Sequence, residues 1–121
     1  MASIEDLTPG GPTAADISTS VVGVLARYTG RGPSKARTYR ADNLVAVLLE
    51  ETLTQGEQTL VDAGRGVLAR DARLALQDAA RDDLVEIVER LTGRTVRQFL
   101  TATEVDPDLT VLLFLLEPDA A

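Results

Sequence analysis

The stretch Leu109-Thr110-Val111-Leu112-Leu113-Phe114-Leu115-Leu116 decides the fold, because every residue in it except Thr110 is apolar. A short apolar run that follows a turn signal, here Val105-Asp106-Pro107-Asp108, is typical of a buried β-strand. A strand that is apolar on both sides needs cover on both sides. We therefore expect it to be buried on both faces, or to have one face on the helices and the other against a partner subunit.

The neighbouring segments predict two β-hairpins. Leu44–Glu50 is a second apolar run, and Ala41-Asp42-Asn43 supplies the turn chemistry that connects it to a strand-like segment at Ala36–Arg40. Thr95–Glu104 is also strand-like and precedes Leu109–Leu116 across the Pro107 turn. Four antiparallel strands follow from these two hairpins.

Helices are predicted before each hairpin. Apolar residues recur at helical spacing in the first helix, at Ile17, Val21, Val24, Leu25 and Tyr28. Thr13 followed by Asp16 resembles a capping box at its start, and Gly30 is a natural C-cap. Thr54 with Glu57 is a full capping box that opens a short helix ending near Gly64.

A longer helix is predicted from about Val67 to Leu91, with Gly93 as its cap. Its apolar residues advance by threes and fours along one expected buried stripe: Leu68, Ala72, Leu76, Ala80, Leu84, Ile87 and Leu91. No proline or glycine interrupts this span.

The predicted fold class is α+β, in the order α-β-β-α-α-β-β. Two layers are expected, with helices on one face of a four-stranded antiparallel sheet. We expect a flexible tail at residues 1–12, which contain Pro9-Gly10-Gly11-Pro12, one domain at 13–118, and a C-terminal tail at 119–121. Because so apolar a sheet has a second face to cover, a homodimer is expected.

Composition excludes several kinds of chemistry. The 121 residues include no Cys and no His, which rules out disulfides, thiolate chemistry, Cys-type zinc sites and histidine general bases. A Ser nucleophile would need a Lys base, and the only Lys, Lys35, is adjacent to Ser34, where the two side chains rarely orient correctly. We therefore expect no enzyme activity, no cofactor and no metal.

Charge and hydropathy suggest the cellular context. The net charge of −7 argues against nucleic-acid binding, because phosphates would be repelled. The apolar runs are far shorter than the roughly 20 residues of a spanning helix, and the N-terminus lacks the pattern of a signal peptide. A soluble, cytoplasmic protein is therefore expected.

One segment departs from the acidic average. Residues 27–40 contain Arg27, Arg31, Lys35, Arg37 and Arg40 and no acidic residue. The glycines around Arg31 would allow backbone amides to approach an anion, so Arg31, Lys35, Arg37 and Arg40 are the candidate site for a phosphate or nucleotide. The other interpretation is a helix C-cap and turn whose cations complement the negative end of the helix.

Two acidic clusters are weaker candidates. The long helix carries Asp78, Asp82, Asp83, Glu86 and Glu89. Arginines are interleaved with them, which is typical of a solvated helix face. Glu104, Asp106 and Asp108 surround the Pro107 turn, but they lack the glycine and distal glutamate of an EF-hand loop.

The order of motifs resembles the MpsC-like family, named for a sodium-translocating membrane-potential-generating system. The most specific match is Gly30-Arg31-Gly32-Pro33 followed by Arg37-Thr38-Tyr39. Further matches are the Asp42-Asn43 turn, Leu53-Thr54 with Glu57 and Leu60, Arg73 on the long helix, Thr92-Gly93, and the closing Val111–Glu117. The resemblance covers residues 15–117 and implies a small accessory protein of an ion or inorganic-carbon transport system. It implies no catalytic residues.

The leading hypothesis is therefore a non-enzymatic accessory or regulatory protein, with a membrane transporter component as a possible partner. A binding domain for an anionic small molecule is the alternative. A short echo between Arg37-Thr38-Tyr39-Arg40 and Arg94-Thr95-Val96-Arg97 indicates either an internal duplication or convergence.

Overall fold

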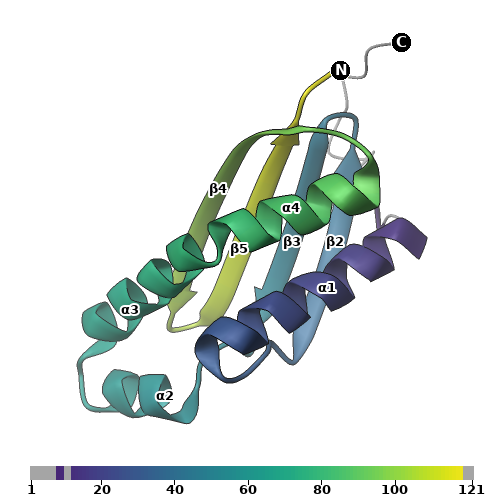
Figure 1. The fold of residues 1–121 in the computed structure, drawn as a ribbon. Helices are drawn as coiled ribbons and strands as arrows, with labels where there is room; N and C mark the ends of the chain where they lie inside the picture. The colour runs from purple at the N-terminus through teal and green to yellow at the C-terminus, as the bar shows by residue number, and fades with distance from the viewer. Residues whose placement is uncertain (1–7, 10–11, 119–121) are drawn as a thin grey trace.

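The computed structural model describes residues 8–9 and 12–118, which form one sheet with helices packed on one of its faces (Figure 1). The elements follow the order β1(Thr8–Pro9), α1(Pro12–Thr29), β2(Lys35–Ala41), β3(Leu44–Glu50), α2(Gln55–Asp62), α3(Gly66–Ala79), α4(Arg81–Thr92), β4(Val96–Val105) and β5(Asp108–Leu116). The α+β class, the two layers and the four long antiparallel strands are confirmed.

The sheet has the order β1-β2-β3-β5-β4, with every neighbouring pair antiparallel. The strand β1 consists of two residues that pair with Tyr39 and Arg40 of β2, a pairing that the expected sequence of elements lacks. The rest of the tail predicted at residues 1–12 lies outside the described residues, except for Pro12, where α1 begins. The C-terminal tail predicted at 119–121 also lies outside them.

The turn, the capping box and the glycine helix caps lie where the sequence predicts them. Asp42 and Asn43 form the two-residue turn between β2 and β3, with Asp42 at φ 51°. Thr54 caps α2, and Glu57 completes the capping box. Gly30 and Gly93 end α1 and α4 in the left-handed conformation, at φ 83° and 69°, where a Cβ would be strained. Thr13 does not cap α1, because the helix already begins at Pro12.

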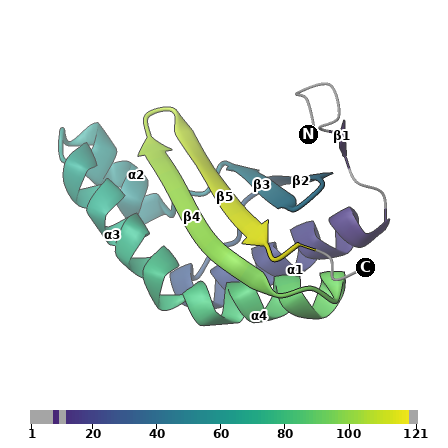
Figure 2. The ribbon, with the colours of Figure 1, turned by 90° about the horizontal axis from the view of Figure 1, so that it is seen from above.

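The prediction of one long helix is wrong, because this stretch forms two helices, α3 and α4, and the helical conformation is interrupted between them at Ala80. Ala80 is fully buried, with φ −85° and ψ −4°, and it ends one helix and precedes the next. The break separates α4, which packs on α1 and β4, from α3, which packs on α2 and β4. Figure 2 shows α1, α3 and α4 on one side of the sheet.

The buried stripe of α3 also differs from the prediction. The buried residues are Ala69, Arg73 and Gln77, while Leu68 is 48% exposed. The reason is the polar surface beneath α3, where Gln77 Oε1 accepts a 2.7 Å hydrogen bond from the Thr101 hydroxyl. In α4 the stripe continues as predicted at the buried Leu84.

The apolar core lies between the sheet and helices α1 and α4. Its fully buried members come from both layers and include Ile17, Val21, Val45, Val47, Leu49, Leu84, Val88, Leu112 and Phe114. The Phe99 and Phe114 rings pack with centroids 5.0 Å apart, and the Arg81 guanidinium lies over Phe99. Tyr28 joins the two helices by donating a 2.7 Å hydrogen bond to Asp83, which raises the pKa of the Tyr28 phenol.

The opposite side of the sheet is also apolar, and no described element covers it (Figure 2). Strand alternation places on this side the residues between the buried ones of each strand. We call this surface the open face. It comprises Tyr39, Ala41, Leu44, Ala46, Leu48, Leu100, Ala102, Leu109, Val111, Leu113 and Leu115.

Candidate functional site

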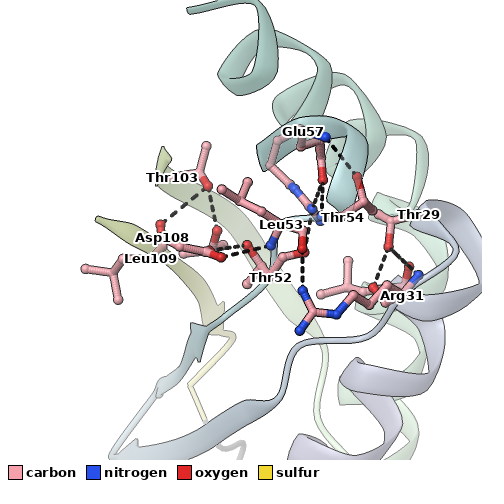
Figure 3. Close-up of polar contacts among 12 residues, drawn as sticks. Thr29, Arg31, Thr52, Leu53, Thr54, Glu57, Thr103, Asp108 and Leu109 are labelled. Atoms are coloured by element: carbon pink, nitrogen blue, oxygen red, sulfur yellow. Dashed lines mark hydrogen bonds and ion pairs between the residues drawn. The ribbon is translucent and has the colours of Figure 1, made fainter. Parts of the chain in front are cut away.

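Polar side chains concentrate at the end of the sheet where β3 leads into α2 (Figure 3). Asp108 lies at the start of β5 and accepts hydrogen bonds from the Thr52 hydroxyl at 2.6 Å and from the Leu53 amide at 2.9 Å. Asp108 therefore holds the β3–α2 connection against the β4–β5 hairpin. Its carboxylate satisfies backbone and hydroxyl donors, which gives this acidic residue a structural role.

A buried ion pair lies beside this connection. Arg73 of α3 contacts the Glu57 carboxylate and donates a 2.6 Å hydrogen bond to the carbonyl of Thr52. Arg73 is 2% exposed and Glu57 is 8% exposed. Glu57 also accepts the Thr54 amide at 2.8 Å, so one carboxylate serves both the helix cap and the ion pair. The N-terminal cap of α2 and the ion pair of the buried Arg73 therefore depend on the same Glu57 carboxylate.

Sequence reasoning missed this ion pair. The capping box correctly identified Glu57, but the predicted stripe of the long helix placed Arg73 away from the core. A basic residue among apolar neighbours at helical spacing was the available signal, since buried arginine requires a partner.

The Gly30-Arg31-Gly32-Pro33 segment forms a second set of anchors. Arg31 donates a hydrogen bond to the Leu53 carbonyl (Figure 3). It donates another, at 3.2 Å, to the Ser34 hydroxyl. A Cβ on Gly32 would lie 2.8 Å from Val22 Cγ1 and 3.3 Å from the Val22 carbonyl oxygen, so only glycine allows this close approach to α1. Pro33 is buried. These contacts give the motif a structural role, because they hold α1, β2 and the β3–α2 connection together. We call this arrangement a clasp.

The same clasp occurs a second time. Thr92-Gly93-Arg94 begins at the last residue of α4 as Thr29-Gly30-Arg31 begins at the last residue of α1. Each threonine hydroxyl donates to the carbonyl four residues earlier, at 2.9 and 2.7 Å, and each hydroxyl accepts the arginine amide, at 3.3 and 3.2 Å. Arg94 then donates to the Glu117 carbonyl at 2.6 Å, beyond the end of β5.

The two clasps belong to two α-β-β units. The sheet order β2-β3-β5-β4 relates α1-β2-β3 to α4-β4-β5 by an approximate two-fold rotation. The two similar segments noted in the sequence, Arg37–Arg40 and Arg94–Arg97, do not occupy equivalent positions in the two units. Arg37–Arg40 lie within β2, whereas Arg94 and Thr95 precede β4. The equivalent pair is instead the Thr-Gly-Arg segment at the end of each helix.

The structure disperses the four candidate anion-binding residues. Arg31 lies in the α1–β2 connection and serves the clasp. Lys35 and Arg37 lie on β2 on the same side as the open face, beside a shallow pocket of about 380 Å³ that Glu50 also lines. Arg40 lies on the other face of β2, because it pairs with the buried Val45. Lys35 and Arg37 are therefore the only two of the four that share a face.

Acidic side chains lie beside Lys35 and Arg37 and offset part of their positive charge. Lys35 Nζ lies 3.4 Å from Glu51 Oε1, and Glu50 is the cross-strand partner of Lys35. Arg37 donates a 3.4 Å hydrogen bond to the Tyr39 hydroxyl, which raises the pKa of the Arg37 guanidinium. This end of β2 is therefore a mixed-charge rim.

Two further expectations concern metals and membranes. Within residues 8–9 and 12–118, no three acidic side chains come together as a metal site would require. In the same part of the chain, no helix combines the length and apolar character needed to cross a bilayer.

The fold and its anchors define a small two-layer α+β protein of two α-β-β units, whose polar side chains mainly hold loops and helix ends. The chain belongs to the MpsC family: the family model described as Na+-translocating membrane potential-generating system (MpsC) matches residues 11–118. The predicted resemblance is thereby confirmed. No curated protein and no solved structure matches the chain.

Substitution of Arg31 by alanine is expected to lower the free energy of unfolding by about 1 kcal/mol, because the Leu53 carbonyl and the Ser34 hydroxyl lose their donor. Urea denaturation followed by circular dichroism measures this change. Arg90→Ala is the control, since Arg90 is exposed on α4, and it should stay within about 0.5 kcal/mol of the wild type. Equal stability of Arg31→Ala and the wild type would contradict the clasp.

Proposed function

We propose that this chain is a non-enzymatic accessory protein of a sodium-translocating membrane system, and that it works by protein contact in the cytoplasm. The family description supports the association with such a system. The open face is the observation that carries contact as the mode of action. Leu100 and Leu115 on this face are 48% and 38% exposed, in a band that runs unbroken across four strands.

The size of the open face supports a contact role. Strands about 4.8 Å apart and a rise of about 3.3 Å per residue give this side of the four strands, seven residues long, a projected area of about 440 Å², and the open face supplies 11 of its 16 residues. Monomeric proteins rarely expose apolar patches beyond a few hundred Å². A surface of this kind marks an interaction site.

The use of the polar residues supports the same proposal. The Arg31 and Arg94 guanidiniums bind backbone carbonyls, and the Asp108 carboxylate binds a backbone amide. Each of these groups has a structural partner. The alternative of a small-anion site has weaker support, because only Lys35 and Arg37 of its four residues share a face and Glu50 and Glu51 lie beside them.

A gene-replacement experiment tests the role. Deletion of the gene from its own host should reduce the sodium-dependent part of the membrane potential, measured with a cationic dye at raised Na+. Re-expression of the wild type should restore it, whereas Leu113→Glu should not, because the charge disrupts the centre of the open face. Asp78→Lys, exposed on α3, is the control and should restore it. An unchanged potential in the deletion strain, or full restoration by Leu113→Glu, would overturn the proposal.

A further inference from the structure

The open face carries a pattern that identifies its occupant. Cross-strand pairing divides the face and its rim into four rows, each with one residue from β2, β3, β5 and β4 in that order. The rows are Lys35, Glu50, Leu109, Glu104; then Arg37, Leu48, Val111, Ala102; then Tyr39, Ala46, Leu113, Leu100; and finally Ala41, Leu44, Leu115, Gln98.

We propose that a second copy of this chain covers the open face, with a two-fold axis that runs parallel to the strands between β3 and β5. This rests on the contact role proposed above and names the partner. Such an axis preserves each row and reverses its order, so β2 lies over β4 of the partner and β3 over β5. The two sheets then form a sandwich, with the helices of both copies on the outside.

This arrangement pairs opposite charges across the interface. Lys35 lies over the partner's Glu104, and the symmetry repeats the contact at the other edge. The Lys35 side chain is 64% exposed even with Glu51 nearby, and Glu104 is also exposed. Within one chain these two residues are three strands apart, about 14 Å, so they cannot pair with one another.

The arrangement also pairs large side chains with small ones. Ala46 lies over the partner's Leu113, Ala102 over the partner's Arg37, and Ala41 over the partner's Gln98. Alternation of large and small residues across a sheet interface lets the two layers interdigitate at the density of a protein interior. One pair in each of the last three rows therefore joins a large side chain to a small one, and the remaining pairs in these rows join two large side chains, such as Leu48 with the partner's Val111.

The available area fits a dimer at the lower end of stable interfaces. The projected area of about 440 Å² per copy understates the accessible area, because side chains roughen the surface, and standard interfaces use about 800 Å² per partner. Pairing of β4 edges is another route to a dimer. Arg70 of α3 opposes that route, because its Nε donates a 3.1 Å hydrogen bond to the Thr103 carbonyl of this edge strand.

Sedimentation equilibrium of the purified chain tests the dimer. The wild type should be a dimer at micromolar concentration. Leu113→Glu should raise the dimer dissociation constant at least about 100-fold, since it places a charge at the centre of the interface. Leu100→Lys is a second variant at an already exposed position, and it should weaken the dimer while leaving the circular dichroism spectrum unchanged.

A charge exchange tests the direction of the axis. Lys35→Glu and Glu104→Lys should each weaken the dimer about tenfold, and the double variant should recover most of the loss. Asp78→Lys on the helical side is the matched control and should leave the dissociation constant unchanged. No recovery in the double variant would overturn this axis.

Other outcomes separate this inference from the proposed function. A wild type that is monomeric at about 100 μM would overturn the dimer, whatever else covers the face. At that concentration only a dimer with a dissociation constant above about 100 μM would be mostly dissociated. Binding of that monomer to lipid vesicles would assign the face to a membrane surface instead. A dimer that survives both Leu113→Glu and Leu100→Lys would overturn the open face as the interface. The deletion and wild-type re-expression arms of the gene-replacement experiment do not depend on which occupant covers the face.

Discussion

Replacement of Arg73 by methionine should lower the free energy of unfolding by about 3–5 kcal/mol, among the largest losses expected for a single substitution in this chain. Arg73 is 2% exposed and contacts Glu57, so its replacement leaves Glu57, a residue that is 8% exposed, without its counter-charge. The Thr52 carbonyl loses its donor in the same step. Urea denaturation monitored by circular dichroism gives the value directly.

A double variant separates the lost pair from the uncompensated charge. Arg73→Met with Glu57→Gln should be more stable than Arg73→Met alone, because glutamine carries no charge and its carbonyl oxygen can still accept the Thr54 amide. Arg65→Met is the control, since Arg65 is exposed and its side chain makes no cap hydrogen bond. A loss below about 1 kcal/mol for Arg73→Met would show that the pair contributes little.

Replacement of Phe114 by alanine should lower the free energy of unfolding by about 3–5 kcal/mol, since it removes a fully buried ring of β5 from the core and leaves a cavity. The Phe99 ring, 5.0 Å away by centroids, would lose its aromatic neighbour. Loss of the ring therefore affects β4, β5 and the helices above them together. Thermal and urea unfolding measure the effect.

A matched apolar substitution distinguishes burial from hydrophobicity. Val67→Ala removes apolar atoms at a position that is 75% exposed, so it should change stability by less than about 0.5 kcal/mol. If Phe114→Ala cost no more than Val67→Ala, the assignment of this ring to the core would be wrong. Since small domains are stable by only about 5–15 kcal/mol, Phe114→Ala should also lower the thermal midpoint by many degrees.

Elements that depend on neighbours in the chain were predictable. The Asp42-Asn43 turn, the Thr54–Glu57 capping box and the glycine caps at Gly30 and Gly93 all lie where the sequence placed them. Each depends on the conformational preference of one residue or on a hydrogen bond over three or four residues. Strands were predictable for a similar reason, because the two runs Leu44–Glu50 and Leu109–Leu116 are apolar except at Glu50 and Thr110.

The candidate site was less predictable. Arg31 was singled out for its charge, and the structure places it in a clasp whose partner, Leu53, lies 22 residues away in the chain. Lys35 and Arg37 were grouped with Arg40, although strand alternation places Arg40 on the other face of β2. Proximity along the chain brought these cations together in the sequence, and the pleat of the strand separated them.

By itself, the sequence determined the α+β class, the two hairpins, the helix caps and the apolar character of both sides of β5. These properties follow from residue periods and from contacts within a turn or two of chain. Only the tertiary structure decided the break at Ala80, the polar buried face of α3 and the ion pair of Arg73 with Glu57. The surface under a helix comes from strands distant in sequence, so its polarity decides which residues of that helix are buried.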